Sequence, residues 1–183
     1  DSFPRFVMLR ALNCMAKLTV KDLNTHGKRV FVRVDYNVPM EEKDGQMVIN
    51  DATRIEATLP TLQLLIQQGA KIILAAHLGR PKGKREPSLS LKPVAAKLSE
   101  MLGRKVEFVD DCVGEKVEQA VAKLQPGEIL LLENVRYYNE EEAKKFSQDV
   151  LGMTWQNTPQ KYRLKDSTLV VAWDLLSRDM RPN

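Results

Sequence analysis

The sequence is poor in the residues that build metal sites and disulfides. Its 183 residues include two cysteines, Cys14 and Cys112, and two histidines, His26 and His77. No CxxC spacing occurs, so a structural zinc site is not expected. The two thiols lie far apart in sequence, and we do not expect them to pair. This cysteine usage is typical of a reducing cytosol and predicts a cytoplasmic location.

Long apolar runs, a strong excess of one charge and nucleotide loops are also missing. No stretch of about 18 apolar residues occurs, so no membrane span is predicted. Lys and Arg number 28 against 24 Asp and Glu, a net charge of +4. This mild excess permits an anionic ligand but does not indicate nucleic acid. GxGxxG is absent, and residues 79–85 (GRPKGKR) are one residue short of a Walker loop. Without interleaved aromatics, this basic run is better interpreted as a solvated loop.

What is present is an alternation of strand and helix patterns. Near-continuous apolar runs are typical of strands covered on both faces, and they occur at residues 29–34, 71–76, 106–109 and 129–132. Helical spacing of apolar residues occurs between them, at residues 53–68, 91–102 and 114–124. The alternation predicts an α/β fold in three layers, with a parallel sheet and helices on both faces.

Polar residues follow three of the predicted strands where each strand ends. They are Asp35 and Asn37 after the first strand, His77, Gly79 and Arg80 after the second, and Glu133, Asn134 and Arg136 after the fourth. The carboxyl ends of parallel strands share one edge of the sheet, and open α/β sheets bind ligands there. The sequence therefore predicts a binding site at this edge.

The residue types at this edge favour a small anion. Arg54, Arg80 and Arg136 each offer a planar fork that matches carboxylate and phosphate oxygens. Each charge-assisted hydrogen bond contributes about 1.5–3 kcal/mol, so two or three would bind a phosphorylated metabolite. Each arginine has a simpler interpretation, either as an ordinary surface residue or as the partner of a nearby glutamate. His77 would bind the anion, orient an arginine or make a structural hydrogen bond.

The polar residues after the first strand also allow two interpretations. Asp35 and Asn37 would accept hydroxyl groups of a ligand and position arginines. Alternatively, they form a turn, which both residue types favour and which the nearby Pro39 supports. Two carboxylates at unknown distance do not establish acid–base chemistry.

Four motifs together resemble the phosphoglycerate kinase family in order and spacing. They are residues 34–39 (VDYNVP), 53–55 (TRI), 77–83 (HLGRPKG) and 132–137 (LENVRY). The resemblance covers residues 15–146 and matches the family's Rossmann-like N-terminal domain. It implies a domain that binds 3-phosphoglycerate or 1,3-bisphosphoglycerate. The family transfers a phosphoryl group between that acyl phosphate and ADP, with magnesium, in glycolysis.

The resemblance also implies roles for the matching residues. Asp35 and Asn37 would contact the glycerate, and Arg54 would contact the carboxyl end and stabilise the migrating phosphoryl group as the catalytic residue. His77, Arg80 and Arg136 would hold the ligand, chiefly around its distant phosphate. In the direction that consumes ATP, the attacking carboxylate is already ionised. Positioning and charge neutralisation therefore suffice, and no general base is needed.

The family pattern ends near Phe146. The expected Asn-Asp-Ala-Phe and His-Arg-Ala-His segments are not found, nor is a nucleotide domain, so we predict a truncated member without its own Mg-ATP/ADP site. Residues 1–14 are interpreted as a leader extension, and residues 147–183 as a divergent tail. Within the tail, residues 167–173 (STLVVAW) are expected to form a strand covering an open sheet edge.

Three functional hypotheses remain open from the sequence. The first is a monomeric phosphoglycerate-binding domain of a kinase that is inactive alone, with no nucleic-acid or membrane partner. The second is a non-catalytic α/β module that retains only the fold. The third is a basic nucleic-acid binder, which would show salt-sensitive binding.

Overall fold

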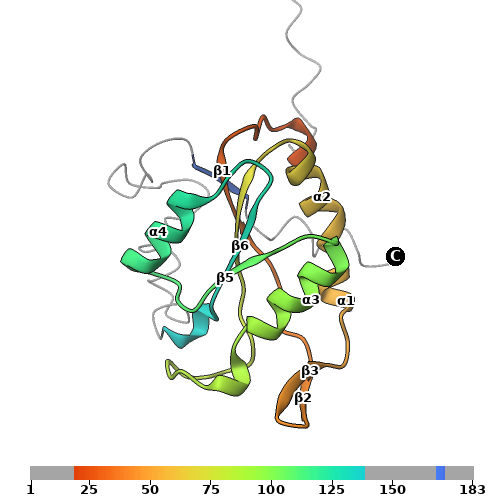
Figure 1. Cartoon of the computed structure of the whole chain (residues 1–183), viewed down its shortest axis with the longest axis vertical. Coiled ribbons are helices and arrows are strands. Elements are labelled where there is room, and N and C mark those ends of the chain that lie inside the picture. The colour runs from red at the N-terminus through yellow and green to blue at the C-terminus, as the bar shows by residue number, and fades with distance from the viewer. Residues whose placement is uncertain (1–18, 139–167, 172–183) are drawn as a thin grey trace, which may run out of the picture.

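A five-stranded parallel sheet forms the centre of the protein. The computed structural model describes residues 19–138 and 168–171. The strand order is β5-β6-β4-β1-β7, and every neighbouring pair is parallel. The strands are β1 (Arg29–Arg33), β4 (Lys71–Ala75), β5 (Glu107–Val109), β6 (Ile129–Leu132) and β7 (Thr168–Val171). The predicted parallel α/β architecture is confirmed (Figure 1).

Helices cover both faces of the sheet because the pleat sends alternate residues to opposite sides. Val30, Ile72 and Ile129 belong to a core that also contains buried residues of α2 (Leu59–Gln67) and α3 (Lys92–Leu102). The neighbouring strand residues Ile73 and Leu130 belong to a second core, which includes Val117 of α4 (Glu115–Lys123). Figure 1 shows α2 and α3 on one side of the strands and α4 on the other.

The single helix predicted over residues 53–68 is wrong, because the structure divides it into α1 (Thr53–Glu56) and α2. Pro60 lies at the start of α2, where it lacks an N–H and its ring would clash with the carbonyl of Glu56 in a continuous helix. The Thr58 hydroxyl occupies the break, donating to the Ile55 carbonyl at 2.7 Å. The Tyr36 and Thr58 hydroxyls are also hydrogen-bonded, 2.9 Å apart.

A two-stranded hairpin that the sequence analysis did not predict follows β1. It consists of β2 (Met40–Lys43) and β3 (Gln46–Ile49), which pair antiparallel. Its turn residues, Asp44 and Gly45, have φ values of 51° and 76°. Asp-Gly is a favoured sequence for two-residue hairpin turns in which both residues have positive φ. The hairpin lies at the carboxyl end of the parallel strands (Figure 1).

β7 forms within the segment predicted to be a strand, residues 167–173. It pairs with β1 in parallel register, so that Arg29 lies opposite Thr168 and Val32 opposite Val171. The predicted leader, residues 1–14, and the rest of the predicted tail lie outside the described residues. The described part of the chain contains no helix long and apolar enough to cross a bilayer.

Candidate functional site at the carboxyl edge of the sheet

Three parallel strands end at the edge where the site was predicted. Asp35 and Asn37 follow β1, His77 and Gly79 follow β4, and the short 3-10 helix η3 (Val135–Tyr137) follows β6. A further 3-10 helix, η2 (Pro87–Leu89), lies at the same end, as does the β2–β3 hairpin (Figure 1). We call this end of the sheet the strand-end edge.

A continuous chain of hydrogen bonds links the three strand ends. The Asn37 N–H donates to Oδ1 of Asp35 at 3.1 Å. The Gly79 N–H donates to Oδ1 of Asn37 at 2.9 Å. The Arg136 guanidinium donates to the Gly79 carbonyl at 2.9 Å. Asp35 and Asn37 thus form the turn that was one of their two interpretations, and the same atoms fix the spacing between neighbouring strand ends.

Gly79 is the residue through which β4 joins this chain. Its φ is +60°, and a Cβ atom added there would lie 2.7 Å from Cδ2 of Leu89. The left-handed backbone favours glycine, and any larger residue would also displace the end of the Leu89 side chain. In this conformation, the N–H of Gly79 faces Asn37 and its carbonyl faces Arg136.

Arg54 reaches the strand-end edge from α1 and forms an ion pair with Asp35. The Arg54 side chain is 51% exposed and that of Asp35 26% exposed, so the pair contributes little to stability. Its effect is to hold the guanidinium beside the end of β1. The beginning of α1 is itself fixed, because Asp51 accepts a hydrogen bond from the Thr53 N–H at 2.8 Å.

His77 is kept neutral by partial burial and, to a lesser extent, by neighbouring positive charges. Partial burial, reinforced by the charges of Arg136, Arg33 and Arg54 and opposed by Asp35, lowers the pKa of His77 to about 4. The imidazole is therefore uncharged at neutral pH and lies within the field of three arginines. Arg33 is a contributor that the sequence analysis missed. Its signal was a second arginine, after Arg29, in a strand pattern that is otherwise apolar.

The structure thus groups five of the six predicted site residues, namely Asp35, Asn37, Arg54, His77 and Arg136. The sixth, Arg80, follows Gly79 directly and is exposed. Within residues 19–138, no hydrogen bond or ion pair joins the Arg80 side chain to the others.

Two buried polar residues at the end of β6 make hydrogen bonds that hold the strand-end edge in place. Asn134 is fully buried, and its side chain hydrogen-bonds the backbone N–H and carbonyl of Leu78 at 3.2 and 2.6 Å. Glu133 is 5% exposed and accepts hydrogen bonds from the backbone of Leu91 and the hydroxyl of Ser90. Asn134 therefore orders the backbone between His77 and Gly79, and Glu133 orders the segment that leads into α3.

The basic run at residues 80–85 is only partly the solvated loop predicted from its sequence. Arg80, Lys82 and Lys84 are exposed. Arg85 differs, because its guanidinium forms an ion pair with Asp111 at 2.7 Å. Arg85 is also exposed, with a side chain 52% accessible to solvent, but it makes a specific contact that the solvated-loop interpretation did not include. The contact joins residues 26 positions apart in sequence (111 − 85), and no local pattern signals it.

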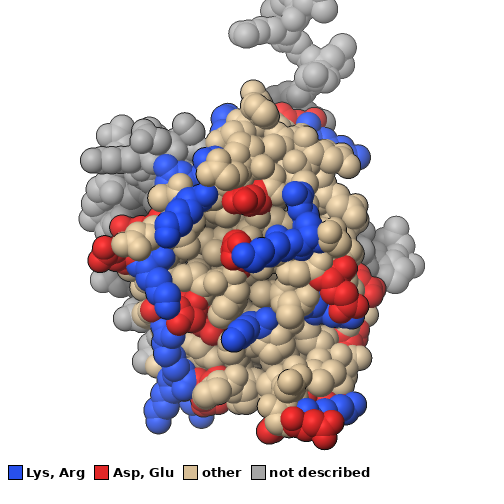
Figure 2. Space-filling model, in the orientation of Figure 1, with Lys and Arg blue, Asp and Glu red and all other residues tan. Residues whose placement is uncertain are grey.

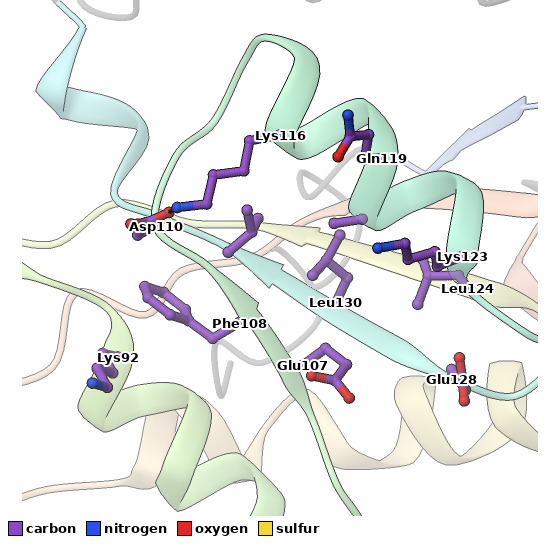
Figure 3. A pocket seen from close by; sticks show the side chains of 12 residues that line it. Lys92, Glu107, Phe108, Asp110, Lys116, Gln119, Lys123, Leu124, Glu128 and Leu130 are labelled. Carbon is purple, nitrogen blue, oxygen red and sulfur yellow. Dashed lines mark ion pairs between the residues drawn. The ribbon is translucent and has the colours of Figure 1, made fainter.

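Basic and acidic side chains lie near one another on the face of the molecule that Figure 2 shows. Figure 2 shows basic side chains in a broken line along one side of the visible face, with acidic side chains between them. A groove of about 850 Å³ lies between α4 and strands β5 and β6. Lys116 and Asp110 form an ion pair at one end of it (Figure 3). No predicted site residue lines this groove.

Charged side chains of the described residues gather as cations at the strand-end edge and not as a cluster of metal ligands. Across residues 19–138 and 168–171, no group of three or more His, Cys, Asp or Glu side chains is arranged to hold a metal ion. The charged groups at the strand-end edge are mainly cations, which suit an anion.

Comparison with known proteins identifies the family. The phosphoglycerate kinase family model matches residues 20–159. The chain is 57% identical over 128 residues to phosphoglycerate kinase of Moorella thermoacetica, covering 70% of this chain and 32% of that relative. It is 57% identical over 129 residues to the chloroplastic enzyme of Volvox carteri, covering 69% and 28%.

Solved structures agree with the sequence relatives. Phosphoglycerate kinase from Pyrococcus horikoshii OT3 has a TM-score of 0.61 and 37% identity, covering 69% of this chain and 30% of that one. The enzyme from Coxiella burnetii has a TM-score of 0.57 and 38% identity, covering 72% and 32%. The chain spans about a third of the length of the relatives it matches. The family model covers most of the sequence, and the chain belongs to the phosphoglycerate kinase family.

Proposed function

We propose that the strand-end edge binds 3-phosphoglycerate or 1,3-bisphosphoglycerate, and that this binding serves phosphoryl transfer between the acyl phosphate and ADP in glycolysis. The observation that carries the proposal is the linked set from Arg54 through Asp35, Asn37 and Gly79 to Arg136. It holds two guanidinium groups in a fixed relation at one edge. Fixed donors bind an anion without first paying the entropy of being ordered.

Each residue has a role that follows from its chemistry. The guanidinium groups of Arg54 and Arg136 would neutralise the carboxyl and phosphate ends of the ligand. Neutral His77 would offer a hydrogen bond without a full charge. Asn37 is exposed beside the fixed turn and would contact the glycerate hydroxyl together with Asp35. Exposed Arg80 would reach the distant phosphate.

Phosphoryl transfer would need little from these residues beyond binding the ligand. Phosphoryl transfer depends on positioning and on neutralising charge that spreads over oxygens. Arg54 is the proposed catalytic residue because its guanidinium would face the carboxyl end, where the phosphoryl group moves. The nucleotide and its magnesium would be held by groups other than the described residues. We therefore expect the 183-residue chain to bind the acid in the cytoplasm as a monomer without turning over ATP by itself.

Calorimetric titration of the chain with 3-phosphoglycerate tests the proposal. Heat of binding is expected for the natural sequence and at least a tenfold weaker affinity for Arg136→Gln. Arg104→Gln is the matched control, because Arg104 is an exposed arginine that lies before the amino end of β5, at the end of the sheet opposite the strand-end edge. Unphosphorylated glycerate should bind more weakly than the phosphorylated acid. No heat with 3-phosphoglycerate would instead favour a module that retains only the fold.

A further inference from the structure

The basic loop, residues 79–86, is fastened at two points to a single residue of η3. The Arg136 guanidinium donates to the Gly79 carbonyl at 2.9 Å. The backbone carbonyl of Arg136 accepts a hydrogen bond from the Gly83 N–H at 3.3 Å. The first half of the loop is thus held against η3 by both the side chain and the backbone of Arg136.

The second half of the loop is held by Tyr137, the next residue of η3. The Tyr137 hydroxyl donates to the Glu86 carbonyl at 2.6 Å. The guanidinium of Arg85 lies over the Tyr137 ring, 5.9 Å from its centroid. This separation is within the range of cation–π attraction.

Arg85 also ties the loop to the turn that follows β5. One guanidinium nitrogen donates to the Asp110 carbonyl at 2.7 Å. Another forms the ion pair with Asp111, also at 2.7 Å. Asp111 is itself fixed, since it accepts hydrogen bonds from the Tyr138 hydroxyl and from the Cys112 N–H. Arg85 is therefore the point where the loop, η3 and the β5–α4 turn meet.

The contacts of Arg85 hold the loop in place more firmly than a single surface ion pair would. The Arg85 side chain is 52% exposed and that of Asp111 28% exposed, so the Coulomb attraction alone is weak. The planar guanidinium, however, engages a carbonyl, a carboxylate and an aromatic ring at once. Lysine has a single ammonium group and does not reproduce this arrangement.

We propose that Arg85 is a positioning residue, which anchors the loop of residues 79–86 and so fixes Gly79 and Arg80 for the phosphate of the ligand. This inference rests on the proposed function. It assigns a purpose to a cation that lies six residues from Gly79 and outside the four motifs that carry the family resemblance. Arg85 would act through the loop and need not touch the ligand.

Two measurements on Arg85→Gln test the anchor. The first is hydrogen exchange of the Gly83 amide without ligand, and the second is the Kd for 3-phosphoglycerate. We expect faster Gly83 exchange and an affinity about five- to tenfold weaker, as for the loss of one charge-assisted contact. Lys84→Gln is the matched control, because it removes one positive charge from the same loop, where Lys84 is exposed and its side chain makes no hydrogen bond or ion pair to another residue of 19–138. It should change both quantities less than about twofold, as expected of a solvated charge.

Arg85→Lys separates charge from geometry, and we expect it to leave the affinity below that of the natural sequence. Equal effects of Arg85→Gln and Lys84→Gln would overturn the proposal, as would faster exchange with an unchanged Kd. If Arg85→Gln does not fold, Asp111→Asn provides the same two measurements. If the natural sequence binds no 3-phosphoglycerate, the proposed function fails. In that case, the exchange rate of the Gly83 amide in Arg85→Gln still tests whether Arg85 anchors the loop.

Discussion

Asn134 hydrogen-bonds both backbone groups of Leu78, accepting from its N–H at 3.2 Å and donating to its carbonyl at 2.6 Å. Leu78 lies between His77 and Gly79, so a buried side chain at the end of β6 sets the backbone of the segment that follows β4. The same amide donates to the Leu89 carbonyl at 2.9 Å. Asn134 thus fixes the position of the backbone after β4 relative to the end of β6.

Asn134→Ala should lower the free energy of unfolding by about 2–4 kcal/mol, because it leaves several buried backbone groups unsatisfied. Urea denaturation of the purified chain measures this change. Asn24→Ala is the control, since Asn24 is exposed and, among residues 19–138, its side chain accepts one long hydrogen bond, 3.4 Å, from the His26 N–H. It should cost less than about 0.5 kcal/mol. Similar losses in the two variants would contradict the structural role given to Asn134.

His77 should make the stability of the protein depend on pH in the acid range. Its folded pKa of about 4 lies below the ordinary value of 6.5. Between these values, the unfolded chain binds a proton that the folded chain does not, so stability falls as pH falls from about 6.5 towards 4. Denaturation at successive pH values should show a shallower decline for His77→Gln than for the natural sequence.

His26→Gln is the matched control for that series. His26 is exposed and its ring lies beside Gly69, before β4 and therefore away from the strand-end edge. The variant therefore controls for the loss of a histidine side chain as such. An unchanged slope in His77→Gln would mean that burial and the neighbouring arginines do not lower the pKa of His77 as described.

The ion pair between Asp35 and Arg54 should matter more for the electrostatics of the site than for stability. Because both side chains are partly exposed, Asp35→Asn should change the free energy of unfolding by less than about 1 kcal/mol. Asp35 is the group that favours the charged form of His77, so its loss should lower the pKa of His77 further. Arg54→Gln should raise that pKa. Imidazole NMR signals followed against pH measure both shifts, and shifts of the opposite sign would refute this charge arrangement.

β7 should protect the sheet at the outer side of β1. A chain ending at residue 150 lacks the strand that pairs with β1, so backbone groups of β1 lose their partners on that side. We expect a lower thermal midpoint and association that increases with protein concentration. Differential scanning calorimetry and analytical ultracentrifugation measure the two effects. An unchanged thermal midpoint and unchanged solubility would show that β7 does not protect the outer side of β1.

The parallel strands were predictable because strands buried on both faces leave near-continuous apolar runs. The polar residues after them were predictable because parallel strands end at one edge. The break between α1 and α2 was missed although Pro60 signals it. The links through Gly79 were not predictable, because they use backbone groups whose partners depend on the packing of neighbouring strands. The contact of Arg85 with Asp111 was also hidden, since it joins two loops distant in sequence.

Amide chemical shifts recorded during titration with 3-phosphoglycerate test the central claim most directly. An anion held by the guanidinium groups of Arg54 and Arg136 should move the signals of Asn37, Gly79 and Arg136 most, with one common Kd. Residues along the groove between α4 and β5 serve as the internal reference and should move little. Absent shifts, or shifts that are largest along that groove, would contradict a phosphoglycerate site at the strand-end edge.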